Sequence, residues 1–360
     1  MHDGSRHESI RLSARTPDST VARHDGNAPR TGRVPARSPE ETPIRRRRRT
    51  RDTILVVSLV LVAAMPGSYF LFGDELTGAS SAPAAGVSPS AAAGRTAVLV
   101  GAGDIASCGS SDDARTADLL AGIDGTIFTA GDNSQDEGTA EQFQDCFDPT
   151  WGRFKDRMKP VPGNHDYLTE NAEGYFGYFG AAAGDRSEGY YSYDLGDWHV
   201  VALNSNCAVV GCSEGSPQER WLRADLAATS RTCTAAYWHH SLFTSSDGHE
   251  PATEVLPLFQ ALYDGGAELV VSGHNHVYER FAPQDPEGGR DDARGIRQFT
   301  VGTGGGGEHY GFERVRPNSQ VRDDRTYGVL ELTLRPRGYD WRFVPVEGST
   351  FTDAGSSPCH

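Results

Sequence analysis

The sequence predicts an α/β fold class from residue 95 onward, and three observations lead to this prediction. Short apolar or β-branched runs alternate with stretches of helical spacing. Most of these runs end at glycine, asparagine or histidine, which are typical of the loops that follow strands. Two strand-like runs also follow one another near the C-terminus, so we expect antiparallel strands there beside the alternating strands and helices.

The individual elements follow from this pattern. The expected strands are 97–100, 126–129, 161–162, 199–203, 234–238, 269–272, 298–301, 329–334 and 339–344. The expected helices are 112–121, 139–147, 217–228 and 253–263. The third helix has the clearest beginning, because Ser216 is a favourable N-cap and Pro217 suits the first helical position.

The chain before this domain divides into three segments of different composition. Residues 1–52 are rich in arginine, serine and proline, and we predict a disordered basic tail. Residues 53–73 carry no charge, and a helix of this length spans roughly 30 Å, about one hydrocarbon core. Residues 74–94 are rich in glycine, alanine, serine and proline and are interpreted as a flexible linker. The remaining segment, 95–360, is the predicted folded domain.

The apolar segment predicts a single-pass membrane anchor. The arginine cluster before it places the tail in the cytoplasm and residues 95–360 on the outer side of the cell membrane. Pro66-Gly67 and the small residues at 79–85 leave a second interpretation open, a cleaved signal sequence and a secreted protein. The long segment before the apolar run argues against cleavage, because the basic start of a signal peptide is short.

Charge excludes one class of partner. The chain has a formal net charge of −15, and the predicted tail carries 13 of its 34 basic residues, so the rest of the chain is more acidic still. Nucleic-acid binding requires clustered lysine and arginine, so an acidic domain of this kind is not expected to bind nucleic acid. Any phosphate group would have to be bound locally, through cations rather than through the charge of the whole surface.

All six cysteines lie within the predicted domain: Cys108, Cys146, Cys207, Cys212, Cys233 and Cys359. An even number confined to the predicted outer part favours disulfides formed in an oxidising compartment. Cys207 and Cys212 are close enough in sequence to cross-link a local loop. The sequence leaves the other pairings open.

Five short polar motifs stand just after strand-like runs. They are Gly103-Asp104, Gly131-Asp132-Asn133, Gly163-Asn164-His165-Asp166, His239-His240 and Gly273-His274-Asn275-His276. Most of them have an ordinary alternative explanation as turns, loops or strand ends. The last is less ordinary, because on a continuing strand His274 and His276 would face the same side. The combination of all five favours a metal site.

The residue types indicate two metal ions and phosphoryl chemistry. Two divalent ions about 3.5–4 Å apart can hold both the attacking and the leaving oxygen of a phosphoryl displacement. Asp132 is the candidate bridge, since each of its carboxylate oxygens can bind one ion. The other candidate ligands are Asp104, Asn164, His239, His274 and His276. This set suits Fe, Zn or Mn better than Ca or Mg.

With these motifs, roughly residues 96–335 resemble the calcineurin-like metallophosphoesterases, and most closely their purple acid phosphatase branch. The run Tyr278-Glu279-Arg280 and the glycines of 302–307 add to the resemblance. The resemblance implies a four-layer αββα sandwich of two mixed sheets, with the metals at the strand ends. It assigns Asp104, Asp132 and His276 to one metal, and Asp132, Asn164, His239 and His274 to the other.

The chain departs from the family pattern beside the first metal. The purple enzymes have a tyrosine three residues after the bridging aspartate, where this chain has Gln135. The wider family has a histidine two residues after the first aspartate, where this chain has Ala106. We hypothesise that water or the Gln135 amide completes the ligand shell. Without tyrosinate, no purple charge-transfer band is expected even with iron bound, and Mn or Zn become plausible occupants of this site.

The expected reaction is hydrolysis of small phosphomonoesters, as in acid phosphatases, by attack of a metal-bound hydroxide. His165 is the candidate for stabilising or protonating the leaving oxygen, with Asp166 orienting its ring. His240 is a second candidate, or a hydrogen-bonding partner of the ligands. The aromatic residues of 167–193 and Arg280 are interpreted as packing elements rather than substrate contacts. No serine nucleophile is expected.

Two other functions remain open at this point. The same metal core would serve a phosphodiesterase acting on nucleotides or lipid head groups. The change at Gln135 also allows a non-catalytic surface protein with a degenerate metal site. The sequence does not indicate an oligomeric state.

Overall fold

The computed structural model describes residues 94–360. The predicted tail, the predicted anchor and all but the last residue of the predicted linker lie outside the described residues. Among the helices of 94–360, none is both long and apolar enough to cross a membrane. The N-terminal predictions therefore stay predictions.

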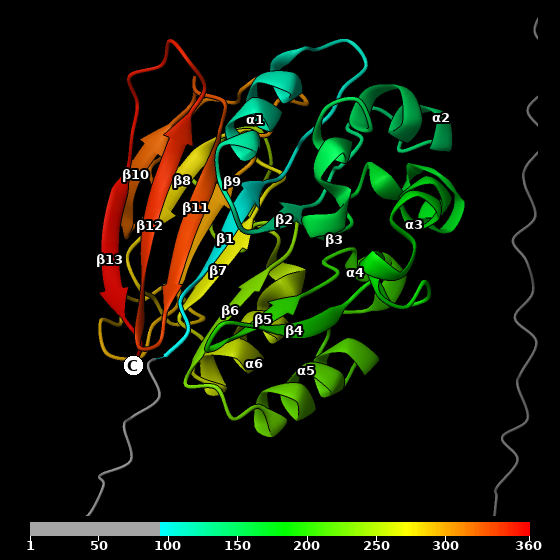
Figure 1. The fold of residues 1–360 in the computed structure, drawn as a ribbon. Coiled ribbons are helices and arrows are strands. Elements are labelled where there is room, and N and C mark those ends of the chain that lie inside the picture. The colour runs from blue at the N-terminus through cyan, green and yellow to red at the C-terminus, as the bar shows by residue number, and fades with distance from the viewer. Residues whose placement is uncertain (1–93) are drawn as a thin grey trace, which may run out of the picture. The chain divides into compact units, whose positions relative to one another are not determined.

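Two β-sheets form the centre of the domain (Figure 1). The first contains, in spatial order, β13 (Ala354–Pro358), β12 (Gly338–Pro345), β11 (Gly328–Arg335), β1 (Ala97–Ala102), β2 (Thr126–Ala130) and β3 (Met158–Val161). The second contains β10 (Ser319–Asp323), β8 (Tyr278–Phe281), β9 (Arg297–Val301), β7 (Leu269–Ser272), β6 (Cys233–Tyr237), β5 (Trp198–Ala202) and β4 (Tyr191–Leu195). Both sheets are mixed, so the predicted α/β class with two mixed sheets is confirmed.

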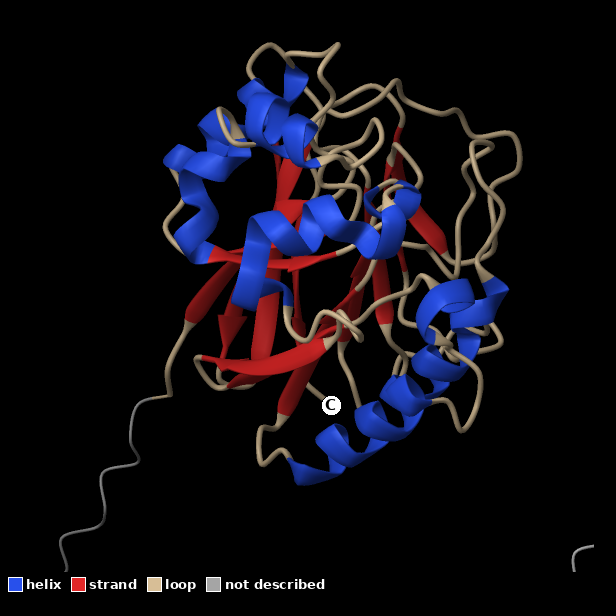
Figure 2. Ribbon diagram, turned by 90° about the vertical axis from the view of Figure 1, so that its right-hand side faces the viewer, coloured by secondary structure: helices blue, strands red, loops and turns tan. Residues whose placement is uncertain are grey.

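Helices cover the outer faces of the sheets (Figure 2). They are α1 (Asp112–Ala121), α2 (Ala140–Gln142), α3 (Glu173–Phe179), α4 (Cys207–Val210), α5 (Pro217–Ala228) and α6 (Leu256–Asp264). The expected helix 139–147 is α2 continued by a π-helical turn, Phe143–Phe147. At the start of α5, the Ser216 hydroxyl accepts a hydrogen bond from the Glu219 backbone N–H, so the predicted N-cap is confirmed.

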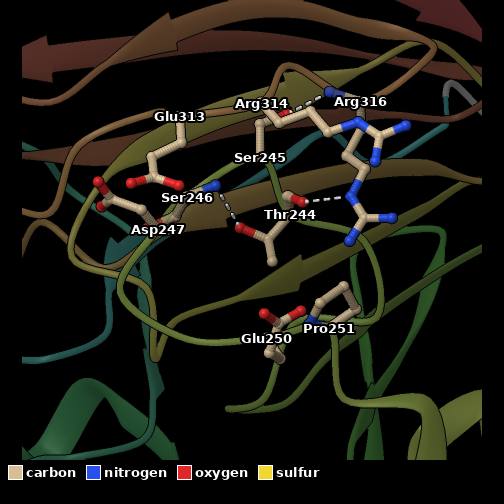
Figure 3. A pocket seen from close by; sticks show the side chains of 9 residues that line it. All are labelled: Thr244, Ser245, Ser246, Asp247, Glu250, Pro251, Glu313, Arg314 and Arg316. Atoms are coloured by element: carbon tan, nitrogen blue, oxygen red, sulfur yellow. Dashed lines mark hydrogen bonds between the residues drawn. The ribbon is translucent and has the colours of Figure 1, made fainter.

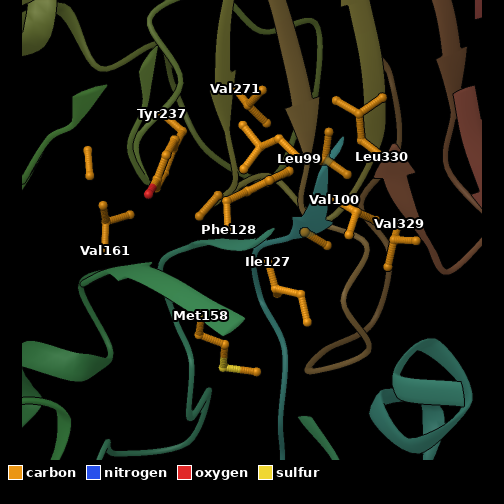
Figure 4. Packing of buried hydrophobic residues seen from close by; sticks show 14 of the residues in the cluster. Leu99, Val100, Ile127, Phe128, Met158, Val161, Tyr237, Val271, Val329 and Leu330 are labelled. Atoms are coloured by element: carbon orange, nitrogen blue, oxygen red, sulfur yellow. The ribbon is translucent and has the colours of Figure 1, made fainter. Parts of the chain in front are cut away.

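Side-chain alternation along the strands produces the layers. On β6, Tyr237 belongs to the large apolar cluster between the sheets, whereas its neighbour Ala236 packs in the cluster beneath α5 and α6. Figure 4 shows Leu99 and Phe128 of the first sheet near Tyr237 and Val271 of the second. Burial on both faces explains why these strands read as continuous apolar runs.

Strand direction places the polar motifs together. β1, β2 and β3 are mutually parallel, and so are β6 and β7, so each set ends at one edge of its sheet. At that edge the Gly103 N–H donates to the Val301 carbonyl at 2.9 Å, which joins the end of β1 to the end of β9 in the other sheet. The loops that carry the five motifs therefore leave the two sheets side by side.

Candidate metal centre

The candidate ligands stand on strained backbone. Asp104, Asp132 and His274 are three of the six non-glycine residues with positive φ in the described part of the chain, at 58°, 49° and 69°. The left-handed region costs a non-glycine residue about 1–2 kcal/mol. Strain of this kind persists where the surrounding structure enforces it, and it is concentrated at functional sites.

Glycines before the ligands allow close approach. A Cβ at Gly131, whose φ is 82°, would lie 2.5 Å from Nδ1 of His239. A Cβ at Gly163 would lie 2.1 Å from Oδ1 of Asp132. Any larger residue would push a candidate ligand away, which explains the glycine that begins these motifs.

Asp132, Asn164 and His239 form one half of the site. The His239 ring is fully buried, and its Nδ1 donates to the Ala130 carbonyl at 2.8 Å. Its Nε2 therefore faces the Asp132 carboxylate at 3.2 Å and the Asn164 amide oxygen at 3.0 Å. Burial lowers the pKa of His239, but the charge and hydrogen bond of Asp132, the charge of Asp104 and the Ala130 carbonyl together raise it more, to about 9. The Asp132 carboxylate thus strongly favours a positive charge beside it.

His274 completes this half from β7. Its Nδ1 lies 3.2 Å from Nε2 of His239, and its backbone N–H donates to Oδ2 of Asp104 at 2.8 Å. Burial and neighbouring histidines lower the pKa of His274, so its ring is neutral. The predicted strand 269–272 is confirmed as β7, and His274 and His276 lie beyond it rather than on a continuing strand. β7 ends at Ser272, and positive φ turns the chain at His274.

Asp104 and His276 form the other half. Nδ1 of His276 donates to the Glu308 carbonyl at 2.9 Å, which leaves Nε2 facing Oδ1 of Asp104 at 3.4 Å. That Oδ1 atom is buried and has no hydrogen-bond partner among the described residues. Buried carboxylate oxygens are normally paired, so this oxygen is available for a cation.

The donor set fits metal ions. Ligand atoms of Asp104, Asp132 and His239 lie within 4.8 Å of one another, and so do those of His239, His240 and His274. Carboxylate oxygens, an amide oxygen and imidazole nitrogens, all of them common metal ligands, converge here. These residues therefore form a candidate metal site.

His165 stands beside the candidate ligands, but Asp166 does not orient its ring. Nδ1 of His165 donates to the Asp136 carbonyl at 2.8 Å, and Nε2 lies 4.0 Å from Oδ2 of Asp132. The fully buried Asp166 carboxylate instead accepts from Asn133 Nδ2 at 2.9 Å and from the Gly163 N–H at 2.8 Å. The predicted role of Asp166 is corrected accordingly. Burial and the charge of Asp132 raise the pKa of Asp166 to about 7.

His240 is held by Ser205. The Ser205 hydroxyl oxygen accepts from the backbone N–H groups of His239 and His240, so its own proton is donated to Nδ1 of His240 at 2.8 Å. Burial and the neighbouring His239 lower the pKa of His240 to about 3. Its neutral ring carries a proton on Nε2, which is the arrangement of a hydrogen-bond donor.

Two side chains that the sequence analysis missed complete the surroundings. The His249 ring stacks on His274 with centroids 3.9 Å apart, and the Tyr310 ring stacks on His276 at 4.5 Å. The two rings also meet edge to face at 5.3 Å. His249 lies ten positions after His239 in an irregular loop, without a neighbouring motif, so periodicity gave no signal for it.

Arg280 and the aromatic residues of 167–193 described below have the packing roles expected of them. Arg280 binds Asp353, with Nε 2.6 Å and a terminal nitrogen 3.1 Å from its two oxygens. Tyr175, Phe176 and Phe179 are buried in the main core cluster. Ser241 is buried and hydrogen-bonds Ser272 at 2.7 Å, so it is not placed as a nucleophile.

A cavity of about 380 Å³ is lined in part by the loop that carries His249. Figure 3 shows its lining, with Asp247 and Glu313 on one side and Arg314 and Arg316 on the other. No predicted site residue lines this cavity. The candidate metal centre is therefore a separate, more buried feature.

Comparison with known proteins agrees with this geometry. A family model described as calcineurin-like phosphoesterase matches residues 94–278. Purple acid phosphatase 15 of Arabidopsis thaliana is 31% identical over 148 residues, which cover 36% of this chain and 27% of that protein. Purple acid phosphatase 21 of the same plant is 28% identical, and the match covers 48% of this chain and 42% of that protein. The chain thus spans less than half the length of these relatives.

Solved structures show the same fold. Purple acid phosphatase PPD1 from yellow lupin seeds superposes with a TM-score of 0.61 at 16% identity, covering 74% of this chain and 54% of that chain. GAP50, described as the anchor in the inner membrane complex of Plasmodium, superposes with a TM-score of 0.52 at 14% identity, covering 72% and 88% respectively. Because the family model spans just over half of the sequence, the chain belongs to the calcineurin-like phosphoesterase family.

Proposed function

We propose that this protein is a two-metal hydrolase of small phosphomonoesters. One observation carries the proposal. The buried ligand atoms of Asp104, Asp132, His239 and His276 converge at the joined edges of the two sheets, and one Asp104 oxygen has no partner among the described residues. The family membership and the purple acid phosphatase relatives support phosphoester hydrolysis as the reaction.

The residues would divide between two ions. Asp132 lies between the halves and would bridge them, since its Oδ2 faces His239. Asp104 and His276 would hold one ion, and Asn164, His239 and His274 would hold the other. Bound Fe, Zn or Mn would neutralise the phosphate oxygens and bring the pKa of a water molecule near neutrality.

His165 would handle the leaving group. The Asp136 carbonyl fixes the Nδ1 proton, so Nε2 is the nitrogen directed towards the site. In its protonated form the ring donates from Nε2 to the departing alkoxide oxygen. His240, with its Nε2 proton retained by the bond from Ser205, would donate a hydrogen bond to a phosphate oxygen.

The proposed location is the outer side of the cell membrane, with residues 53–73 as the anchor. The described domain contains three disulfides, Cys108–Cys146, Cys207–Cys212 and Cys233–Cys359, and no free cysteine remains there. The predicted local pair is thereby confirmed. Disulfides of this number are typical of oxidising compartments and support the proposed location.

The test is kinetic. Purified full-length protein, stripped with a chelator and refilled with Mn, Zn or Fe, is assayed on p-nitrophenyl phosphate and on bis(p-nitrophenyl) phosphate. We expect metal-dependent turnover of the monoester that Asp132→Asn abolishes. Asp292→Asn, in an exposed pair with Arg290, is the matched control. Preferred turnover of the diester would assign the phosphodiesterase, and metal uptake without turnover would assign the non-catalytic protein.

A further inference from the structure

Gln135 occupies a fixed position beside the Asp104 half of the site. Its backbone N–H donates to the Ala106 carbonyl at 2.7 Å, which ties the loop after β2 to the loop after β1. A Cβ at Gly306 would lie 2.9 Å from Cβ of Gln135, so the glycine-rich segment packs directly against it. The side chain is only 8% exposed. Its amide therefore has few alternative positions.

The Gln135 amide faces the ligand nitrogen of His276. The two Nε2 atoms lie 3.3 Å apart. Because Nδ1 of His276 donates to the Glu308 carbonyl, Nε2 is the ring nitrogen left for a ligand, and the Gln135 amide stands against it. The amide thus covers the nitrogen that a metal ion would bind.

The other end of the amide is unsatisfied. Oε1 of Gln135 is buried and has no hydrogen-bond partner among the described residues. Oδ1 of Asp104, which lies 3.4 Å from the same His276 nitrogen, shares this condition. Both side chains that contact this imidazole nitrogen thus carry a buried oxygen without a hydrogen-bond partner among the described residues, where polar atoms are normally paired.

A half-turn of the amide exchanges its oxygen and nitrogen without moving the rest of the side chain. In that orientation Oε1 stands near Nε2 of His276, where an N–H donor stood before. We propose that Gln135 is a metal ligand of the Asp104 half, where its amide would present Oε1 to the cation that Asp104 and His276 would hold. This inference rests on the proposed metal centre.

The identity of this ligand has a consequence for the ion. An amide oxygen is neutral, so the negative charge around the first ion comes only from Asp104 and the shared Asp132. Hard oxygen donors with this modest charge match a divalent ion such as Mn²⁺. We therefore assign a divalent ion to the Asp104 half.

Calorimetric titration of the metal-free full chain with Mn²⁺ tests the inference, and electron paramagnetic resonance follows the bound ions independently of activity. We expect two ions in the wild-type protein. In Gln135→Leu we expect at least a tenfold weaker affinity, equivalent to about 1.4 kcal/mol, at one site only. Gln135→Glu, which retains an oxygen at the same reach, restores tight binding. Gln260→Leu on α6, which removes an amide that donates to Asp264, is the matched control.

Each outcome separates the two proposals. Wild-type affinity at both sites in Gln135→Leu would overturn the role of Gln135 while leaving the metal centre intact. Failure of the wild-type protein to take up any ion would overturn the metal centre itself and Gln135 with it. If Gln135→Leu does not fold, Gln135→Asn shortens the reach of the same amide by one methylene. It must then show the same loss at one site, and wild-type binding by it would contradict the inference.

Discussion

Asp104 and Asp353 are both buried carboxylates of the same domain, yet they differ sharply in how many hydrogen-bond and ion-pair partners they have. Asp353 accepts hydrogen bonds from Tyr278 at 2.7 Å and from Trp341 at 3.2 Å, in addition to its ion pair with Arg280. Asp104 receives one backbone N–H, and its other oxygen has no partner among the described residues. The comparison teaches that this fold pairs the buried charge of Asp353 fully and leaves one buried oxygen of Asp104 unpaired at the candidate metal centre.

The two regions also differ in the length of chain that their disulfides close. Removing these disulfides should give the largest change in the free energy of unfolding. Cys233–Cys359 closes 126 residues next to the segment that carries Asp353, whereas Cys207–Cys212 closes 5 residues beside the Ser205 loop. Loop entropy predicts a loss of about 5 kcal/mol in the free energy of unfolding for the double serine variant of the first and about 2 kcal/mol for the second. Urea unfolding measures both, and equal losses would contradict the entropic explanation.

Asp353→Asn should come next in size. The change leaves the Arg280 guanidinium buried without its carboxylate, and breaking such a pair costs about 3–5 kcal/mol. We expect the free energy of unfolding to fall by about 3 kcal/mol while metal content per folded molecule stays at two ions. Arg342→Gln, which removes an exposed pair with Glu331, is the control and should have a far smaller effect. Loss of metal in Asp353→Asn would break the contrast with Asp104.

Asp104→Asn should show the reverse behaviour. Metal affinity and hydrolysis should fall by about 100-fold or more, since even outer partners of metal ligands are worth 10–100-fold. The metal-free variant should be as stable as the wild-type protein or more stable, because a buried unpaired charge has been removed. Urea unfolding in chelator measures this, and a large destabilisation of the metal-free variant would show that Asp104 serves stability.

His199 extends the comparison to a histidine that is paired with carboxylates away from the candidate metal centre. Its replacement should have the smallest effect on the free energy of unfolding. His199 lies between Asp225 at 2.8 Å and Asp194 at 3.3 Å, and Arg231 also binds Asp194. Burial lowers the pKa of His199, but the two carboxylates raise it more, so its pKa lies above 6.5. Its stabilising contribution is therefore complete below pH 6.5 and is lost as the pH rises through the raised pKa.

The variant His199→Gln should lose about 1 kcal/mol of unfolding free energy near pH 5.5 and less near pH 9. Urea unfolding at the two pH values measures the difference. A loss that grew with pH would show that the ring is neutral in the folded protein. Hydrolysis should be unaffected, because His199 lies on β5 away from the candidate ligands.

The site was more predictable from sequence than the edges of the sheets. The apolar strands buried on both faces gave strong local signals, and the glycine–ligand motifs followed them directly. β10 and β13, with sequences SQVRD and AGSSP, were not predicted, because they are edge strands held by pairing rather than by an apolar pattern. The predicted strand 161–162 begins three residues after the start of β3 at Met158. Pro160 argues against a strand in the sequence, but β3 is an edge strand, and an edge position tolerates proline.

The missed site residues come from loops that only tertiary contacts can place. The loop that carries His249 is fixed by the buried Glu279, whose carboxylate accepts the Ser245 N–H at 2.8 Å. The carbonyl that orients His165 belongs to the backbone of Asp136. Every residue has such a carbonyl, so the residue type at this position gives no sign of the contact. Neither contact could have been derived from spacing.

Asp136 also connects the catalytic candidate to a covalent bond. While its carbonyl holds His165, its carboxylate accepts from the Ser107 hydroxyl at 2.9 Å and from the Cys108 N–H at 3.0 Å, and Cys108 is bonded to Cys146. A newly made chain with both thiols reduced would lack the tether behind this relay. We expect such a chain to mature into a working catalyst only when this cysteine pair is oxidised.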